Sequence, residues 1–125
     1  MAKLAINARD LGVPIGPFSH AVRSEQLLFL SGQVGVLPHS SRLVEGGVEA
    51  QTAQALKNLT EVLEAAGKSL ADVVRVGVYL TSITDFAAMN AVYATYFSEP
   101  FPSRTTIAVA ALPLGACVEI DMVVQ

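Results

Sequence analysis

A single basic residue near the end of the chain is the first candidate for chemistry. Arg104 is the only lysine or arginine in the last fifty residues, and it begins a run of small and β-branched apolar residues at 104–110. In a strand, Arg104 would share one face with Thr106 and Ala108, whose small side chains leave space beside it. A guanidinium binds a carboxylate through two parallel hydrogen bonds, which an ammonium cannot do. Arg104 is therefore a candidate to bind a small carboxylate-bearing molecule.

Glu119 is the second candidate, with Asp121 on the same face of a later strand. A glutamate whose pKa is raised by burial can hold a water and act as a general base. The simpler alternative is a structural ion pair between Arg104 and Glu119. If the last two strands form a hairpin that turns near Pro113, however, Arg104 and Glu119 lie at different heights along it. At a rise of about 3.3 Å per residue, their separation within one chain exceeds about 10 Å. Each then has a different partner, or they meet only across a subunit boundary.

The first half of the chain predicts two strands and a helix. A strand beginning near His20 and a second at residues 27–33 are separated by the turn at 24–26, which indicates a hairpin. The apolar period changes at residues 48–66 to that of an amphipathic helix. Gly67 follows as a left-handed cap that ends this helix.

The second half predicts three strands and a helix. Residues 73–80 alternate as a strand with one strongly apolar face. Thr84 is placed as the N-cap of a second amphipathic helix, which ends before Pro100. Two strands at 104–110 and 117–124 complete the order β-β-α-β-α-β-β.

These elements predict one α+β domain spanning residues 1–125, with a mixed sheet and both helices on one face. Hydrophobic residues make up 52 % of the chain and charged residues only 15 %, against about 25 % charged in an average soluble domain. A single copy has little room to bury this apolar excess. We therefore expect the bare face of the sheet to pack against other copies in a closed oligomer.

Composition argues against several classes of protein. The net charge is −3 and the basic residues are scattered, so we expect no nucleic-acid partner. The longest uncharged stretch, at 105–118, is short and contains a proline and a glycine, so we expect no membrane span. The first dozen residues lack the apolar core of a secretory signal, which favours a cytoplasmic protein. One cysteine and two distant histidines predict no metal site.

Four motifs together resemble the reactive-intermediate deaminase family, also called RidA or YjgF. They are GPFSHAV at 16–22, FLSGQVG at 29–35, LVEGGVEAQTAQALKNLTEVLEAAG at 43–67 and PSRTTIAVAALPLGACVEIDM at 102–122. The resemblance implies a chorismate-mutase-like fold assembled as a homotrimer with clefts between subunits. It also implies hydrolysis of 2-imino acids and their enamine tautomers, such as 2-aminoacrylate and 2-iminobutanoate, to 2-oxo acids and ammonia. No cofactor is implied.

The resemblance also assigns roles to individual residues. Arg104 matches the arginine that binds the substrate carboxylate, and Glu119 matches the acid that positions the attacking water. Ser31 and Gly32 match the cleft-lining SGQ motif, although such a pair is equally expected where a strand ends. Asn90 matches a family asparagine, although the simpler interpretation is a surface amide or a structural hydrogen bond.

Two positions depart from the common pattern of the family. Phe18 stands where many members have tyrosine, and Thr106 where many have cysteine, so a thiol is not essential here. Both are expected in the substrate site. His20 and His39 are interpreted as a strand and a loop residue without a catalytic role. The alternative function is a non-enzymatic trimer that binds metabolites or acts as a chaperone under stress; a ribonuclease is disfavoured by the acidic balance.

Overall fold

The computed structural model describes residues 2–125 and contains a mixed sheet with two α-helices. The strands are β1 (Leu4–Ile6), β2 (Ala21–Ser24), β3 (Leu27–Val34), β4 (Val73–Leu80), β5 (Ser103–Ala108) and β6 (Val118–Val124). The helices are α1 (Gly47–Ala65) and α2 (Phe86–Tyr93), with 3-10 turns η1 (Arg9–Leu11), η2 (Leu70–Asp72), η3 (Ile83–Asp85) and η4 (Pro113–Gly115). The predicted α+β fold is confirmed, with the short strand β1 added before it.

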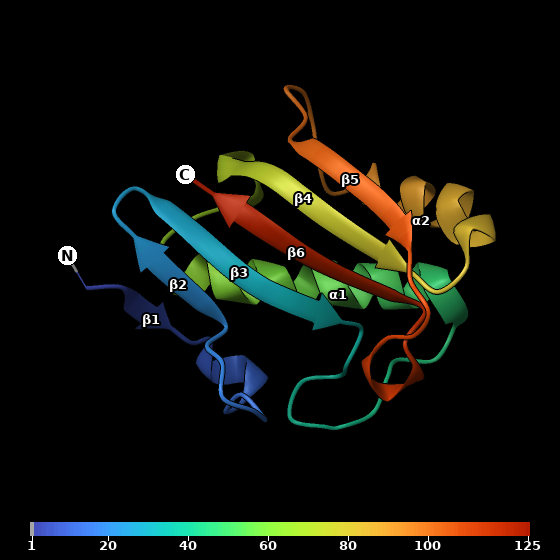
Figure 1. The fold of residues 1–125 in the computed structure, drawn as a ribbon, viewed down its shortest axis with the longest axis horizontal. Coiled ribbons are helices and arrows are strands. Elements are labelled where there is room, and N and C mark those ends of the chain that lie inside the picture. Colours follow the sequence, from blue (N-terminus) through green and yellow to red (C-terminus); the bar gives the residue numbers. More distant parts are fainter. Residues whose placement is uncertain (1) are drawn as a thin grey trace.

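The sheet has the strand order β1-β2-β3-β6-β4-β5, and only β4 and β5 run parallel. The expected hairpin between the last two strands is wrong, because β4 lies between β5 and β6. The connection from β4 to β5 contains α2 and forms a crossover, which is what parallel neighbours require. In Figure 1 the red strand β6 runs through the centre of the sheet, while β5 forms one edge.

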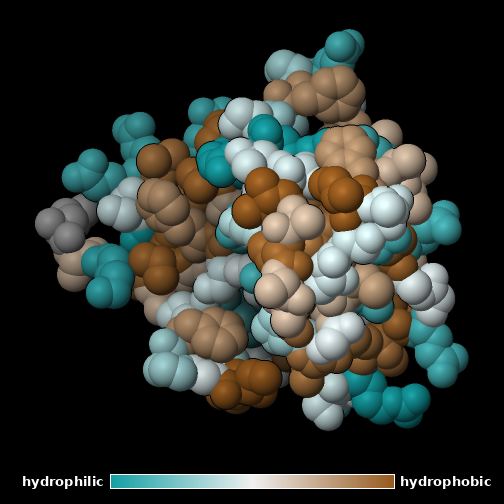
Figure 2. Space-filling view, turned by 45° about the vertical axis from the view of Figure 1, so that its right-hand side comes forward, coloured by the Kyte–Doolittle hydropathy of each residue, from teal (hydrophilic) through white to brown (hydrophobic). Residues whose placement is uncertain are grey.

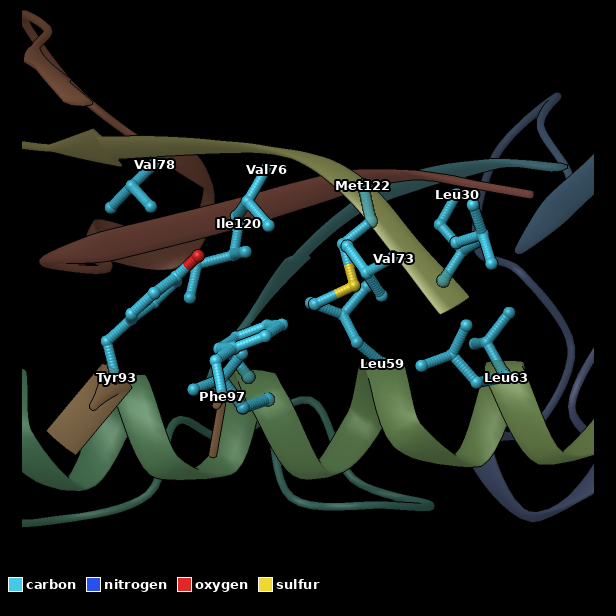
Figure 3. Close-up of a cluster of buried hydrophobic side chains, with 14 of the residues drawn as sticks. Leu30, Leu59, Leu63, Val73, Val76, Val78, Tyr93, Phe97, Ile120 and Met122 are labelled. Atoms are coloured by element: carbon cyan, nitrogen blue, oxygen red, sulfur yellow. The ribbon is translucent and has the colours of Figure 1, made fainter. Parts of the chain in front are cut away.

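The core lies between one face of the sheet and the helices. Along β6 every second residue is buried, and Ile120 and Met122 point toward α1. The long helix α1 packs against them with an apolar stripe that includes Leu59 and Leu63, both completely buried. Figure 3 shows these side chains meeting between the strands above and α1 below, with Tyr93 beside them. The alternating period of the strands and the helical period of α1 therefore define this single core.

Within residues 2–125 no helix covers the other face of the sheet, as predicted (Figure 1). Phe29 on β3 and Ile107 on β5 lie on this uncovered face, and each is nearly half exposed. Figure 2 shows hydrophobic side chains scattered among more polar ones across the visible side of the molecule. Apolar surface therefore remains available on a single copy. No helix among residues 2–125 is long and apolar enough to cross a membrane.

The second helix differs from its expected bounds. Thr84 lies inside η3 instead of capping α2, whose N-cap is Asp85. The Thr84 hydroxyl lies 2.6 Å from that of Ser82, so it is engaged in the preceding turn. The helix then ends at Tyr93, and residues 94–96 continue as turns. Its eight residues are nevertheless enough to place an aromatic face over β5.

Candidate active site

Arg104 lies on the helix-covered face of β5, level with buried Val76 of β4. Its guanidinium carbon is 4.6 Å from the ring centroid of Tyr93 and 5.6 Å from that of Phe86. The expectation of only small neighbours beside Arg104 is therefore incomplete, because α2 supplies an aromatic wall. Two rings attract the cation by cation–π interaction, and the planar guanidinium remains suited to a planar anion.

Three buried polar atoms without hydrogen-bond partners lie on α2 and β5. They are Asn90 Oδ1, the Tyr93 hydroxyl and Thr106 Oγ1. Phe86, Asn90 and Tyr93 succeed one another at helical spacings of four and three, so they share one face of α2. Buried polar groups are usually paired, which makes this group a candidate ligand site. We call Asn90, Tyr93, Arg104 and Thr106 the arginine cluster.

Burial raises the pKa of the Tyr93 hydroxyl, while the nearby Arg104 charge opposes that shift in part. The phenol therefore stays protonated at neutral pH and can donate a hydrogen bond. The arginine cluster thus combines a fixed cation with neutral donors, a combination that suits a carboxylate.

Glu119 lies on the uncovered face of β6, level with Tyr79 of β4 and Val34 of β3. Burial, and then the charge of Asp121, raises the pKa of the Glu119 carboxyl. Asp121 accepts a hydrogen bond of 2.9 Å from the Tyr79 hydroxyl, which fixes its position. A carboxyl with a raised pKa next to a cavity is suited to take up and return a proton.

Gly32 is placed directly against the Glu119 carboxylate. A Cβ atom at this position would collide with Glu119 Oε2, so the absence of a side chain is what admits the carboxylate. The pairing of β3 with β6 shifts register between Leu30 and Gln33, around this glycine. Ser31 does not present a free hydroxyl, because its Oγ donates to the Ser19 carbonyl at 2.7 Å.

Glu119 and Gly32 line a cavity of about 580 Å³. Phe18 lies on its wall, as do Leu114 of η4 and His20, which directly precedes β2. The lining is mainly apolar, which is typical of small-molecule sites. We call it the glutamate cavity; Arg104 is not among its lining residues.

The arginine cluster and the glutamate cavity lie on opposite faces of one sheet. Arg104 is level with Val76, whose side chain enters the core, whereas Glu119 is level with Tyr79 on the opposite face. The structure thereby excludes a structural ion pair within one chain. The predicted site residues form two groups: Asn90, Arg104 and Thr106 on one face, and Phe18, Gly32 and Glu119 around the cavity. Ser31 belongs with the second group through its backbone, because it directly precedes Gly32 and its N–H donates to the carbonyl of His20.

The sequence analysis does not find the contribution of Tyr93 and Phe86 to the arginine cluster, because in an amphipathic helix such aromatic residues are expected simply to face the core. Their signal was the spacing with Asn90, which places all three on one helix face. Among residues 2–125, no group of three potential ligands is placed to hold a metal ion.

The sheet order and the two helices on one face define a chorismate-mutase-like α+β protein. A family model described as endoribonuclease L-PSP matches residues 10–125. The chain is 47 % identical over 123 residues to the 2-iminobutanoate/2-iminopropanoate deaminase of Capra hircus, covering 98 % of this chain and 90 % of that one.

Solved structures agree with this match. RidA from an Antarctic Psychrobacter superposes with a TM-score of 0.92 at 39 % identity, covering 98 % of both chains. Escherichia coli TdcF with bound serine superposes with a TM-score of 0.89 at 31 % identity, covering 97 % of both. The chain belongs to the reactive-intermediate deaminase (RidA, YjgF) family.

Proposed function

We propose that this protein hydrolyses reactive 2-imino acids and their enamine tautomers to 2-oxo acids and ammonia. The observation that carries the proposal is Arg104, a cation within cation–π distance of two rings, on elements that also carry three buried polar atoms without hydrogen-bond partners. The deaminase activity named for the Capra hircus relative supports the same reaction. The serine bound to TdcF supports a small amino-acid-like ligand.

The proposed assembly is a homotrimer in the cytoplasm. Because Arg104 and Glu119 face opposite sides of one sheet, a complete site requires the arginine cluster of one copy beside the glutamate cavity of the next. The half-exposed Phe29 and Ile107 supply apolar surface for such contacts. A closed ring then repeats the same site at each boundary.

The proposed reaction begins when Arg104 binds the substrate carboxylate, with the Tyr93 and Thr106 hydroxyls able to add hydrogen bonds. Glu119 accepts a proton from a water as its oxygen attacks the carbon of the protonated imine, whose π electrons move onto the nitrogen to give a neutral carbinolamine. Glu119 then returns this proton to the amine nitrogen, and the C–N bond breaks as the C=O bond forms, so that ammonia leaves. The proton that remains on the carbonyl oxygen passes to solvent, which balances the proton that the iminium brought.

The deciding experiment generates 2-aminoacrylate or 2-iminobutanoate with a dehydratase and follows loss of the imine against the spontaneous rate. The wild-type protein should accelerate the loss. Arg104→Ala should abolish the acceleration, and Arg104→Lys should restore little of it, because one ammonium cannot form the two-pronged contact. Lys57→Ala, on the exposed side of α1, is the matched loss of a surface cation and should change nothing.

No acceleration by the wild-type protein would overturn the proposal. Binding of 2-oxobutanoate by calorimetry without any acceleration would instead favour the alternative of a metabolite-binding trimer.

A further inference from the structure

His20 is a buried histidine whose ring is held in one protonation state. Only 4 % of the residue is exposed. The backbone N–H of Ala8 donates to His20 Nδ1 at 3.0 Å, and the backbone N–H of His20 donates to Asn7 Oδ1 at 2.8 Å. Because Nδ1 accepts a hydrogen bond, it carries no proton, so the ring is neutral with its proton on Nε2.

The same residue is tied to the strand that abuts Glu119. The carbonyl of His20 accepts a hydrogen bond of 3.0 Å from the N–H of Ser31. Ser31 precedes Gly32, which lies against the Glu119 carboxylate. His20 also lines the glutamate cavity, together with Leu11 of the N-terminal segment. His20 therefore joins residues 7–12 on one side to the position of Glu119 on the other.

We infer that His20 is a positioning residue for the glutamate cavity. Its neutral ring is required to hold residues 7–12 in place beside Ser31 and Gly32. A proton on Nδ1 would place two N–H donors against each other at Ala8, and the hydrogen bond would be lost. The segment that carries Leu11 would then lose its attachment through Ala8 and keep only the hydrogen bond from the His20 backbone to Asn7. This inference rests on the proposed function for its catalytic consequence, although the Ala8 bond itself does not.

Burial lowers the pKa of His20, so the neutral form persists below the usual range of histidine. The charged and titratable groups on the surrounding elements are Arg9 and Asp10 of η1, Arg23 of β2, His39 of the loop between β3 and α1, and Glu119 of β6. The unfolded chain binds more protons between the lowered pKa and the usual one, so folding stability should rise with pH across that window. Above the usual pKa of histidine the ring is neutral in both the folded and the unfolded chain, so His20 no longer lowers the folding stability.

The catalytic test compares the pH dependence of kcat/KM for the wild type, His20→Asn and His20→Leu. Asparagine keeps an acceptor near the position of Nδ1 and does not titrate, whereas leucine removes the acceptor. Two protonations, on Glu119 and His20, should steepen the wild-type acid limb to about a hundredfold per pH unit. His20→Asn should retain activity near neutral pH and fall only about tenfold per unit. His20→Leu should be impaired at every pH.

An acid limb that has the same slope in the wild type and in His20→Asn would overturn the inference. So would full activity of His20→Leu, because the acceptor would then be dispensable.

A second measurement does not depend on deaminase activity. Amide hydrogen exchange by NMR, corrected for intrinsic rates, should show that the Ala8 N–H loses protection as the His20 ring titrates. The amide of Thr81, which donates to the Cys117 carbonyl in another part of the molecule, is the control and should stay protected. Equal loss at both amides, or no loss at Ala8, would overturn the inference. If the wild type shows no catalysis, the proposed function fails while this measurement still tests the role of His20.

Discussion

The carboxyl of Glu119 has an environment that sets the pH range in which it can act. Its pKa is raised first by burial and then by the charge of Asp121. The group serves as a base only when ionised, so activity should fall as pH decreases through this raised pKa. Asp121→Asn removes the charge but not the burial, and should move the acid limb of kcat/KM part of the way to lower pH.

The control for this prediction is Tyr79→Phe, which removes the hydrogen bond to Asp121 but leaves its charge in place. In that variant kcat/KM should fall at the same pH on the acid side as in the wild type. An unchanged limb in Asp121→Asn would contradict the assigned cause.

Gly32 offers a second test at the scale of one residue. In Gly32→Ala, the new methyl group meets the Glu119 carboxylate, a side chain that can move aside. We expect a large loss of kcat with little change in the free energy of unfolding. Gly35→Ala is the contrasting control, because its methyl would lie 2.7 Å from the backbone of Gln51 in α1 and should destabilise the fold. Urea unfolding and imine-loss rates on both variants separate the two effects.

Asn58 connects two elements around the glutamate cavity. From the buried side of α1, its Nδ2 donates to the carbonyl of Val36 at 2.9 Å and to that of Val34 at 3.4 Å. Asn58→Leu leaves these carbonyls without their donor and should lower the free energy of unfolding by about 2 kcal/mol. Gln54→Ala removes only a neighbouring donor to Asn58 Oδ1 and should cost less than about 1 kcal/mol. Equal losses in the two variants would contradict this role.

The elements show what the sequence could predict. The helical period of α1 and the alternation of β6 are local patterns, and both are confirmed. The alternation of β4 is confirmed from Val76 onward, but a register shift between Val73 and Arg75 buries Val73 and leaves Val74 exposed. The neighbours of β5 could not be found in this way, because its pairing with β4 depends on the path of the α2 crossover. The three-residue strand β1 is too short to show a period. Arg104 and Glu119 were recognised by residue type, but their opposite faces follow only from the strand order.

Subunit complementation tests the site at the scale of the whole molecule. Arg104→Ala and Glu119→Gln should each be inactive alone. If one copy supplies the arginine cluster and its neighbour the glutamate cavity, random mixed trimers should regain about a quarter of wild-type activity, since each side is intact in half of the copies. The mixture is prepared by co-refolding the two variants in equal amounts, and light scattering checks the mass of the assembly.

Co-refolded wild type is the control for losses during preparation. A mixture as inactive as its components would contradict a site shared between copies. A species of 13.1 kDa, the mass of one copy, would contradict the trimer itself.

The central position of β6 has a consequence for how the chain reaches its native state. This strand occupies the space between β3 and β4, both of which precede it by many residues. During synthesis, those two strands must wait with unpaired edges until residues 118–124 emerge from the ribosome. Pairings between distant parts of a chain slow folding, and waiting edges invite pairing with other chains. Nascent chains of this protein should therefore be a natural client for chaperones until their last strand is in place.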